Sequence, residues 1–109
     1  MPFLPYGRQT IDEEDIEVVA EVLRGDYLTT GPSVDAFERA LADFVGADRA
    51  VACSSGTAAL HLAVLALGIE PDEVAIVPSV TFAATANAVR YVGGEVVFAD
   101  VDPETGLMR

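Results

Sequence analysis

The sequence predicts an α/β fold with a mostly parallel sheet and βαβ crossovers. In the second half of the chain, short apolar runs alternate with segments of helical length, as strands do when crossover helices join them. These runs are continuously apolar, which is typical of strands that are covered on both faces. The first half shows helical periodicity instead. We therefore expect an arm and two helices over residues 1–48 and a βαβαβ unit over residues 49–102.

The first helix is expected to follow an extended arm. Residues 1–9 hold two prolines and a glycine, which favour extended backbone over a helix. Thr10 and Glu13 have the spacing of a capping box, and Asp12 is an alternative cap. Apolar residues then recur at helical spacing until Gly25, where we expect the helix to end.

A second helix is expected after the loop "DYLTTGPS". Ser33 can cap this helix, because its hydroxyl can accept a hydrogen bond from a free amide of the first turn. An apolar stripe at helical spacing follows, and Gly46 is expected to end the helix. The stripe consists of Val34, Phe37, Leu41, Phe44 and Val45.

Three strands and two helices are expected beyond this point. The predicted strands are residues 50–54 ("AVACS"), 73–79 ("EVAIVPS") and 95–102 ("EVVFADVD"). The predicted helix over residues 57–67 is apolar nearly all round, so we expect it to be buried. The predicted helix over residues 81–92 is closed by two glycines.

Charge and cysteine content bear on the class of partner. The 109 residues include 18 acidic and 6 basic ones, all six of them arginines, for a net charge of −12. This balance argues against binding nucleic acid or an anionic membrane. The longest apolar run is too short to span a bilayer, and the N-terminus lacks the pattern of a signal peptide. Cys53 is the only cysteine, so we expect a reducing, cytoplasmic setting.

The stretch "SSGTA" lies where a predicted strand becomes a helix. A phosphate at such a helix N-terminus meets free backbone amides and a favourable dipole. Gly56 would let the backbone approach the phosphate, and Thr57 adds a hydroxyl donor. The alternative is that Ser55 or Thr57 only caps the helix. The stretch is neither a P-loop nor a GxGxxG turn, since it lacks the lysine of the first and the spacing of the second.

Other residues near the predicted strand ends have two interpretations each. Phe82 could stack on a planar ligand or be a core phenylalanine. Asp100 and Asp102 could hold a metal ion, but "PETG" after them is a turn signature. His61 lies in the apolar helix, where a core role is favoured over a ligating one. Cys53 has no basic neighbour in sequence to activate it as a nucleophile.

Three blocks together resemble a known family. They are "YGRQTIDEEDIEVVAEVLRGDYLTTGPSVDAFERALADFVGA", "SSGTAALHLAVLALG" and "VPSVTFAATANAVRYVGGEVVFADVD". In this order they resemble the start of the pyridoxal-phosphate-dependent sugar aminotransferases of the DegT/DnrJ/EryC1/StrS family. The resemblance implies the N-terminal part of a fold-type-I large domain, with its mostly parallel sheet. It also implies a homodimer whose active sites lie at the subunit interface.

The resemblance also implies roles for individual residues. The cofactor pyridoxal 5′-phosphate would contact residues at the start of the apolar helix with its phosphate, and Phe82 would stack on its pyridine ring. The phosphate positions are Gly56, Thr57 and Ala58. The positions that would line the nucleotide-sugar site are Tyr6, Asp26, Tyr27, Leu28, Thr29 and Gly56. No catalytic residue and no metal ligand is implied within this chain.

The implied reaction moves an amino group from glutamate to a keto group of a nucleotide sugar. The arm and the "YLTTGP" loop are most similar to the UDP-4-amino-4,6-dideoxy-N-acetyl-β-L-altrosamine transaminases, which use a 4-keto-6-deoxy UDP-sugar in pseudaminic acid synthesis. The family needs a Schiff-base lysine, and this chain has no lysine. We therefore expect no transaminase activity from this chain alone. The alternative is a short, non-catalytic α/β module for binding or assembly that derives from the same fold.

Overall fold

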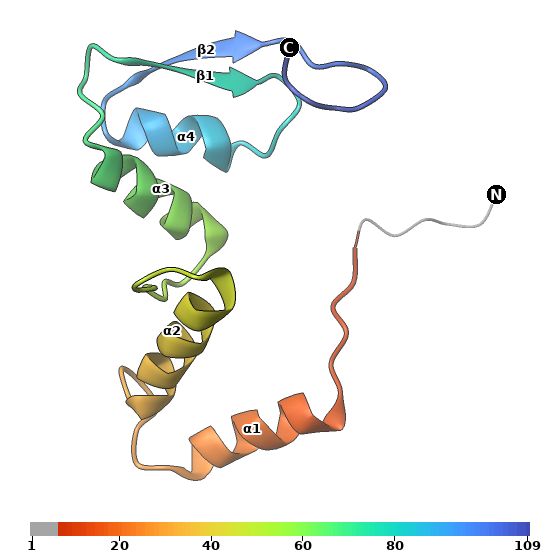
Figure 1. The fold of residues 1–109 in the computed structure, drawn as a ribbon, viewed down its shortest axis with the longest axis vertical. Coiled ribbons are helices and arrows are strands. Elements are labelled where there is room, and N and C mark those ends of the chain that lie inside the picture. The colour runs from red at the N-terminus through yellow and green to blue at the C-terminus, as the bar shows by residue number, and fades with distance from the viewer. Residues whose placement is uncertain (1–6) are drawn as a thin grey trace, which may run out of the picture. The chain divides into compact units, whose positions relative to one another are not determined.

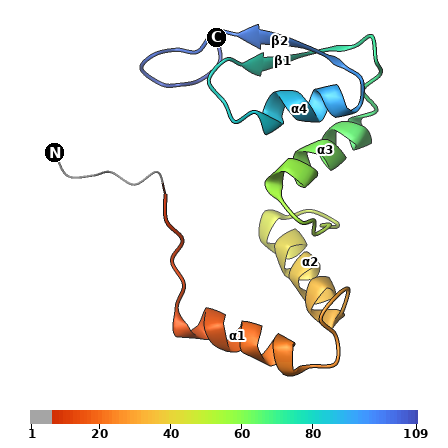
Figure 2. The same ribbon diagram turned by 180° about the vertical axis from the view of Figure 1, so that it is seen from behind.

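The computed structural model describes residues 7–109, so Tyr6 lies outside the described residues. The chain divides into two compact units, residues 1–52 and residues 53–109. The first unit is helical and the second combines helices with a small parallel sheet (Figure 1, Figure 2).

The first helix, α1 (Glu13–Arg24), begins two residues later than the Thr10–Glu13 capping box would place it. Asp12 is the N-cap, and its carboxylate accepts a hydrogen bond from the amide of Asp15 at 3.1 Å. The Asp15 carboxylate accepts one in return from the Asp12 amide, also at 3.1 Å. The alternative cap is therefore the one that forms, and Gly25 ends the helix as predicted.

The second helix, α2 (Pro32–Val45), begins at a proline, and its N-cap is Gly31 rather than the predicted Ser33. Proline favours the first helical position because its fixed φ suits the helix and that position needs no N–H. This places Ser33 inside the first turn. Gly46 ends α2 with φ of 70°, a left-handed conformation that favours glycine, as predicted.

The predicted strand over residues 50–54 is not formed. A strand needs a partner ladder, and the amide of Ala52 donates instead to a Glu38 carboxylate oxygen at 2.7 Å. Val51, expected to be buried, exposes 76% of its surface. The sheet of the described residues therefore has two strands, where the sequence predicted three.

The second unit is a βαβ arrangement preceded by a helix. Strands β1 (Val74–Pro78) and β2 (Glu95–Ala99) pair in parallel, with Val74 opposite Glu95 and Pro78 opposite Ala99. Helix α4 (Ala84–Tyr91) connects them and packs against both strands. Helix α3 (Gly56–Leu67) packs against α4, so the order of layers is sheet, α4 and α3 (Figure 1, Figure 2).

The core of the second unit lies between the sheet and α4. Val77, Ala84, Ala88 and Val89 are buried there. Gly94 precedes β2 at a close approach, because a Cβ on it would lie 2.9 Å from side-chain atoms of both Ile69 and Val89.

Helix α3 was expected to be buried, yet none of its residues is. An apolar helix is buried only where other elements cover it, and α4 is the main element that contacts α3 among the described residues. Its outward leucines therefore stay exposed: Leu60, Leu62, Leu65 and Leu67. Within residues 7–109, no helix is long and apolar enough to cross a membrane.

Candidate active site

The loops that follow β1 and β2 leave the sheet at one end. Helices α3 and α4 both begin at that end, as the two opposite views agree (Figure 1, Figure 2). The segment before α4 follows β1 directly, and the segment from Asp100 to Asp102 follows β2. Ligands of parallel α/β proteins bind at this carboxyl end of the strands. The candidate residue Phe82 thus follows strand β1, and Asp100 and Asp102 follow β2. The stretch "SSGTA" enters α3 without a strand before it.

The start of α3 keeps two backbone donors free. Ser55 is the N-cap in extended conformation, and its hydroxyl accepts a hydrogen bond from the Ala58 amide at 3.2 Å. Its carbonyl accepts another from the Ala59 amide at 3.0 Å. Among residues 7–109, nothing accepts from the amides of Gly56 and Thr57. Ser55 is therefore the cap, while the next two amides stay available to a ligand.

The chemistry of this helix start suits a phosphate monoester. The first turn of α3 contains no acidic residue, whereas that of α1 contains three, although the chain has 18 in all. The partial positive charge of the N-terminus is therefore not already neutralised by a local carboxylate. A Cβ built on Gly56 would meet nothing within 4 Å, so the space beside its backbone is open. Thr57 adds a hydroxyl that no described residue binds.

Phe82 lies just before α4 and exposes 75% of its surface. The core interpretation of this ring is therefore wrong for the described structure, and the ring is free to contact a planar ligand. The predicted helix start at residue 81 moves to Ala84, so Phe82 stands on a short segment between strand and helix.

That segment contains a contact that the sequence analysis missed. The hydroxyls of Thr81 and Thr85 lie 3.0 Å apart and share a hydrogen bond. The Thr85 amide also donates to the Phe82 carbonyl at 3.0 Å. The spacing of two threonines four residues apart in "TFAAT" was the available signal, because such residues meet across one turn.

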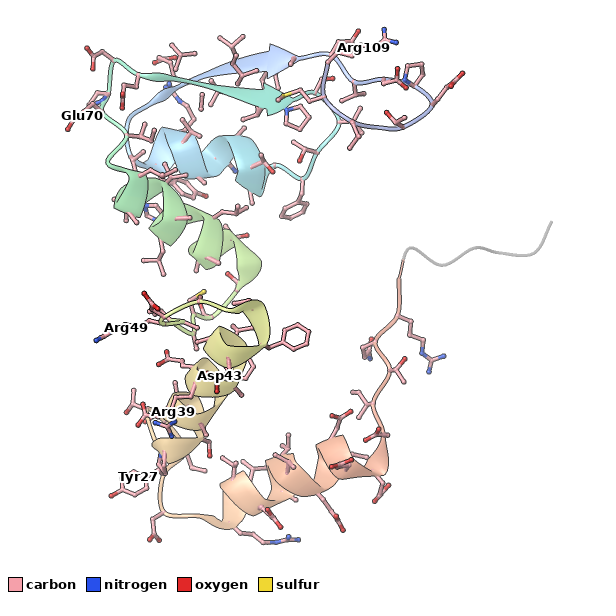
Figure 3. All side chains as sticks on the ribbon, in the orientation of Figure 1. Tyr27, Arg39, Asp43, Arg49, Glu70 and Arg109 are labelled. Atoms are coloured by element: carbon pink, nitrogen blue, oxygen red, sulfur yellow. The ribbon has the colours of Figure 1, made fainter. Side chains whose placement is uncertain are left out.

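The residues predicted to line the sugar site, Asp26–Thr29, form the loop between α1 and α2 in the first unit. The Tyr27 ring projects outward, away from the helices (Figure 3). Asp26 and Tyr27 line an open hollow of about 270 Å³ together with residues of both helices. A Cβ on Gly31 would lie 2.6 Å from the Cβ of Tyr27, so the loop conformation requires glycine there.

The remaining candidates have structural roles. Asp102 accepts hydrogen bonds from the amides of Glu104 and Thr105 and pairs with Arg109 at 2.8 Å, which confirms the predicted turn. His61 is half-buried and meets the Tyr91 ring edge-on at 5.2 Å, so it is not the expected core residue. Cys53 is exposed, and its thiol donates to the Ser55 carbonyl at 3.4 Å. Residues 7–109 contain no cluster of three or more potential metal ligands.

A family match extends from residue 9 to residue 109, and the family is the DegT/DnrJ/EryC1/StrS aminotransferases. The chain belongs to this family. The resemblance noted in the sequence is thereby confirmed, as is the α/β fold class with a parallel sheet.

Several known proteins are similar to this chain. The UDP-4-amino-4-deoxy-L-arabinose–oxoglutarate aminotransferase of Shewanella sediminis is 45% identical over 102 residues, covering 94% of this chain and 26% of the relative. The spore coat polysaccharide biosynthesis protein SpsC of Bacillus subtilis is 47% identical over 103 residues, with the same coverage. The PLP form of the putative sugar aminotransferase Spr1654 from Streptococcus pneumoniae superposes with a TM-score of 0.86 at 32% identity, covering 96% of this chain and 27% of that one.

This chain is short for its family. It spans about a quarter of the length of the curated relatives that it matches. Its similarity to the solved structure extends over nearly all of this chain and about a quarter of that one.

Proposed function

We propose that this chain is the N-terminal portion of a pyridoxal-phosphate-dependent nucleotide-sugar aminotransferase. The observation that carries the proposal is the start of α3, where two free amides and the Thr57 hydroxyl lie in one turn that contains no carboxylate. The amides of Gly56 and Thr57 would hold the cofactor phosphate, beside Ala58, whose own amide bonds the Ser55 hydroxyl. The exposed Phe82 ring would lie against the pyridine ring. The cofactor supplies the electron sink for amino transfer when bound. The protein residues named here bind and orient it.

A binding experiment tests this proposal on the chain itself. Pyridoxal phosphate and inorganic phosphate are titrated separately while the backbone amides are followed by NMR. Both ligands should shift the Gly56 and Thr57 amides, and only pyridoxal phosphate should also shift Phe82. Thr57→Val should raise the Kd for both ligands about fivefold, as expected for one lost hydrogen bond. Thr105→Val, which removes a hydroxyl from the C-terminal turn, serves as the control. Unmoved Gly56 and Thr57 amides at saturating ligand would refute the proposal.

The proposed substrates are glutamate and a 4-keto-6-deoxy UDP-sugar of pseudaminic acid synthesis. The support is the similarity of the arm and the loop of Asp26–Thr29 to that subfamily; the loop is open to solvent, with Tyr27 free to contact a nucleotide. We further propose a cytoplasmic homodimer. Titration of UDP, GDP and dTDP sugars against the Tyr27 resonances tests the nucleotide preference, and equal responses to all three would contradict it.

A second candidate is a non-catalytic binding or assembly module that derives from the same fold. The 109 residues contain no lysine side chain for the covalent bond to the cofactor that the family reaction needs. We expect no product from this chain with a keto sugar, glutamate and pyridoxal phosphate. Sequencing the gene beyond the Arg109 codon separates the candidates: an open frame that contains a lysine-bearing loop supports the aminotransferase, and a stop codon supports the module.

A further inference from the structure

The segment that carries Phe82 is held by few contacts. After the Ser79 amide, which donates to the Ala99 carbonyl at 2.9 Å, the described structure gives no hydrogen bond to Val80. The next two bonds are those of the Thr81 hydroxyl and the Phe82 carbonyl, and both lead to Thr85. The Phe82 ring is 75% exposed, so packing does not hold it. Its position therefore depends on the backbone and on Thr85.

Thr85 is itself well anchored. It lies in the first turn of α4, directly after Ala84, which is 4% exposed in the core of the second unit. Ala88, one turn further, is 1% exposed. The helix start has no side-chain cap, because its N-cap is Ala83. The Thr81–Thr85 hydroxyl pair thus links the preceding segment to a helix that the core holds in place.

From these contacts we propose that Thr85 is a positioning residue that orients the Phe82 ring toward the pyridine ring of the cofactor. The inference rests on the proposed function. Thr85 would not touch the cofactor. Its amide and hydroxyl hold the residues at positions 82 and 81, so that the ring is presented before the ligand arrives and less order is lost on binding.

Thr85→Val tests the inference, because valine keeps the shape and the backbone amide but removes the hydroxyl bond to Thr81. Without ligand, this variant should shift the Phe82 and Thr81 resonances and increase backbone mobility over residues 80–82, measured by ¹⁵N relaxation. With ligand, the Kd for pyridoxal phosphate should rise about fivefold, as expected for one lost hydrogen bond. The Kd for inorganic phosphate, which needs only Gly56 and Thr57, should stay within twofold.

Two matched variants control the experiment. Thr85→Ser retains the hydroxyl and should restore the wild-type Kd and the Phe82 resonances. Thr105→Val also removes a hydroxyl that accepts one hydrogen bond, from the Leu107 amide at 3.3 Å, but in the C-terminal turn. It should leave both Kd values and the Phe82 resonances unchanged.

The outcomes separate this inference from the proposed function. If Thr85→Val weakens both ligands equally, Thr85 only stabilises the unit, and the inference is wrong. Equal Kd values for pyridoxal phosphate in wild type and variant overturn it as well. If the wild-type chain ignores pyridoxal phosphate, the proposed function fails and so does orientation toward a cofactor. The measurements without ligand then still show whether Thr85 orders Phe82.

Discussion

Ser55, Gly56 and Thr57 have different hydrogen-bonding roles at the start of α3. Ser55 satisfies the Ala58 and Ala59 amides with its hydroxyl and its carbonyl, and thereby caps the helix. The Gly56 and Thr57 amides remain without a described acceptor. The two interpretations of "SSGTA" are therefore compatible, because the cap and the candidate phosphate site use different amides of one turn.

Gly31 is a second position where one residue decides local structure. We expect Gly31→Ala to displace Tyr27, since the new Cβ would lie 2.6 Å from the Cβ of Tyr27. The amide resonances of the loop Asp26–Thr29 should shift, and the cost should be about 1 kcal/mol, the low end for overpacking, because the exposed ring can move. NMR spectra and urea unfolding measure the two effects.

Gly7→Ala is the matched control for this substitution. A Cβ on Gly7 meets nothing within 4 Å. It should leave the loop resonances unchanged. A Gly31→Ala spectrum that matches the wild type around Tyr27 would show that the loop does not depend on glycine.

Asp102 gives a pH-dependent turn. The Arg109 guanidinium first, and then the amides of Thr105 and Glu104, hold the pKa of this carboxyl below its ordinary value of 3.8. The ionised form is favoured in the folded turn, so its contribution is complete above the ordinary pKa and is lost as the pH falls through the lowered one. A ¹³C carboxyl titration should therefore place Asp102 below 3.8, with the Glu104 and Thr105 amides shifting over the same acid range.

Arg109→Gln controls the titration by removing the main cause. In this variant the pKa of Asp102 should move back toward the ordinary value. High salt should also raise the pKa of Asp102, but by less. The side chains of Asp102 and Arg109 are partly exposed, so salt screens their interaction. A wild-type Asp102 that titrates at or above 3.8 would contradict the hydrogen bonds and the ion pair that its carboxylate makes in the turn.

At the level of the element, α1 depends on its capping box. We expect Asp12→Ala to destabilise α1 by about 1 kcal/mol, since it leaves the Asp15 amide without its acceptor. The loss of helical signal, measured by circular dichroism and by the ¹³Cα shifts of residues 13–16, should report this change. Thr10→Ala should have no effect, because Thr10 lies outside the helix. A larger loss of helical signal in Thr10→Ala than in Asp12→Ala would support the Thr10–Glu13 capping box instead.

The elements differ in how well periodicity predicted them. Strands β1 and β2 and helices α1 to α4 form close to their predicted ranges, because each contains its own periodic pattern or turn signal. Residues 50–54 have the composition of a strand but do not form one. A strand is stable only when it pairs with another strand. The Ala52 amide donates to a Glu38 carboxylate oxygen and not to a neighbouring strand.

At the level of the whole molecule, the described residues bury few large side chains. The buried hydrophobic residues among them are Ala42, Val77, Ala84, Ala88 and Val89. Large apolar side chains are exposed on α2, α3 and both strands, for example Phe44, Leu65 and Ile76. Such surface favours association, and the sheet has open edges.

We therefore predict that the isolated chain self-associates. Sedimentation velocity across a dilution series should show a concentration-dependent increase in mass. The increase should be larger at high salt, because the net charge of −12 opposes association at low salt. A stable monomer at every concentration and salt level would contradict this prediction.

Much of the candidate site could be predicted from the sequence, because its residues lie next to helix starts. Glycine, serine and threonine before an apolar run marked the start of α3, and the family resemblance implied a phosphate-binding role that stays a prediction. The exposure of Phe82 could not be predicted. It depends on α4 beginning at Ala84 rather than at residue 81, and on the rest of the unit leaving the ring uncovered.

The α/β class and the order of most elements could be predicted because periodicity, caps and glycine stops are local signals, and three sequence blocks indicated the family. Which amides of α3 stay free, which contacts hold the segment of Phe82 and whether residues 50–54 pair depend on the folded chain. These outcomes depend on acceptors that can lie far from the donor in the sequence, as Glu38 lies 14 residues from Ala52. An amide donates to an acceptor that the fold brings within about 3 Å, and a local sequence pattern does not predict which distant residue comes that close.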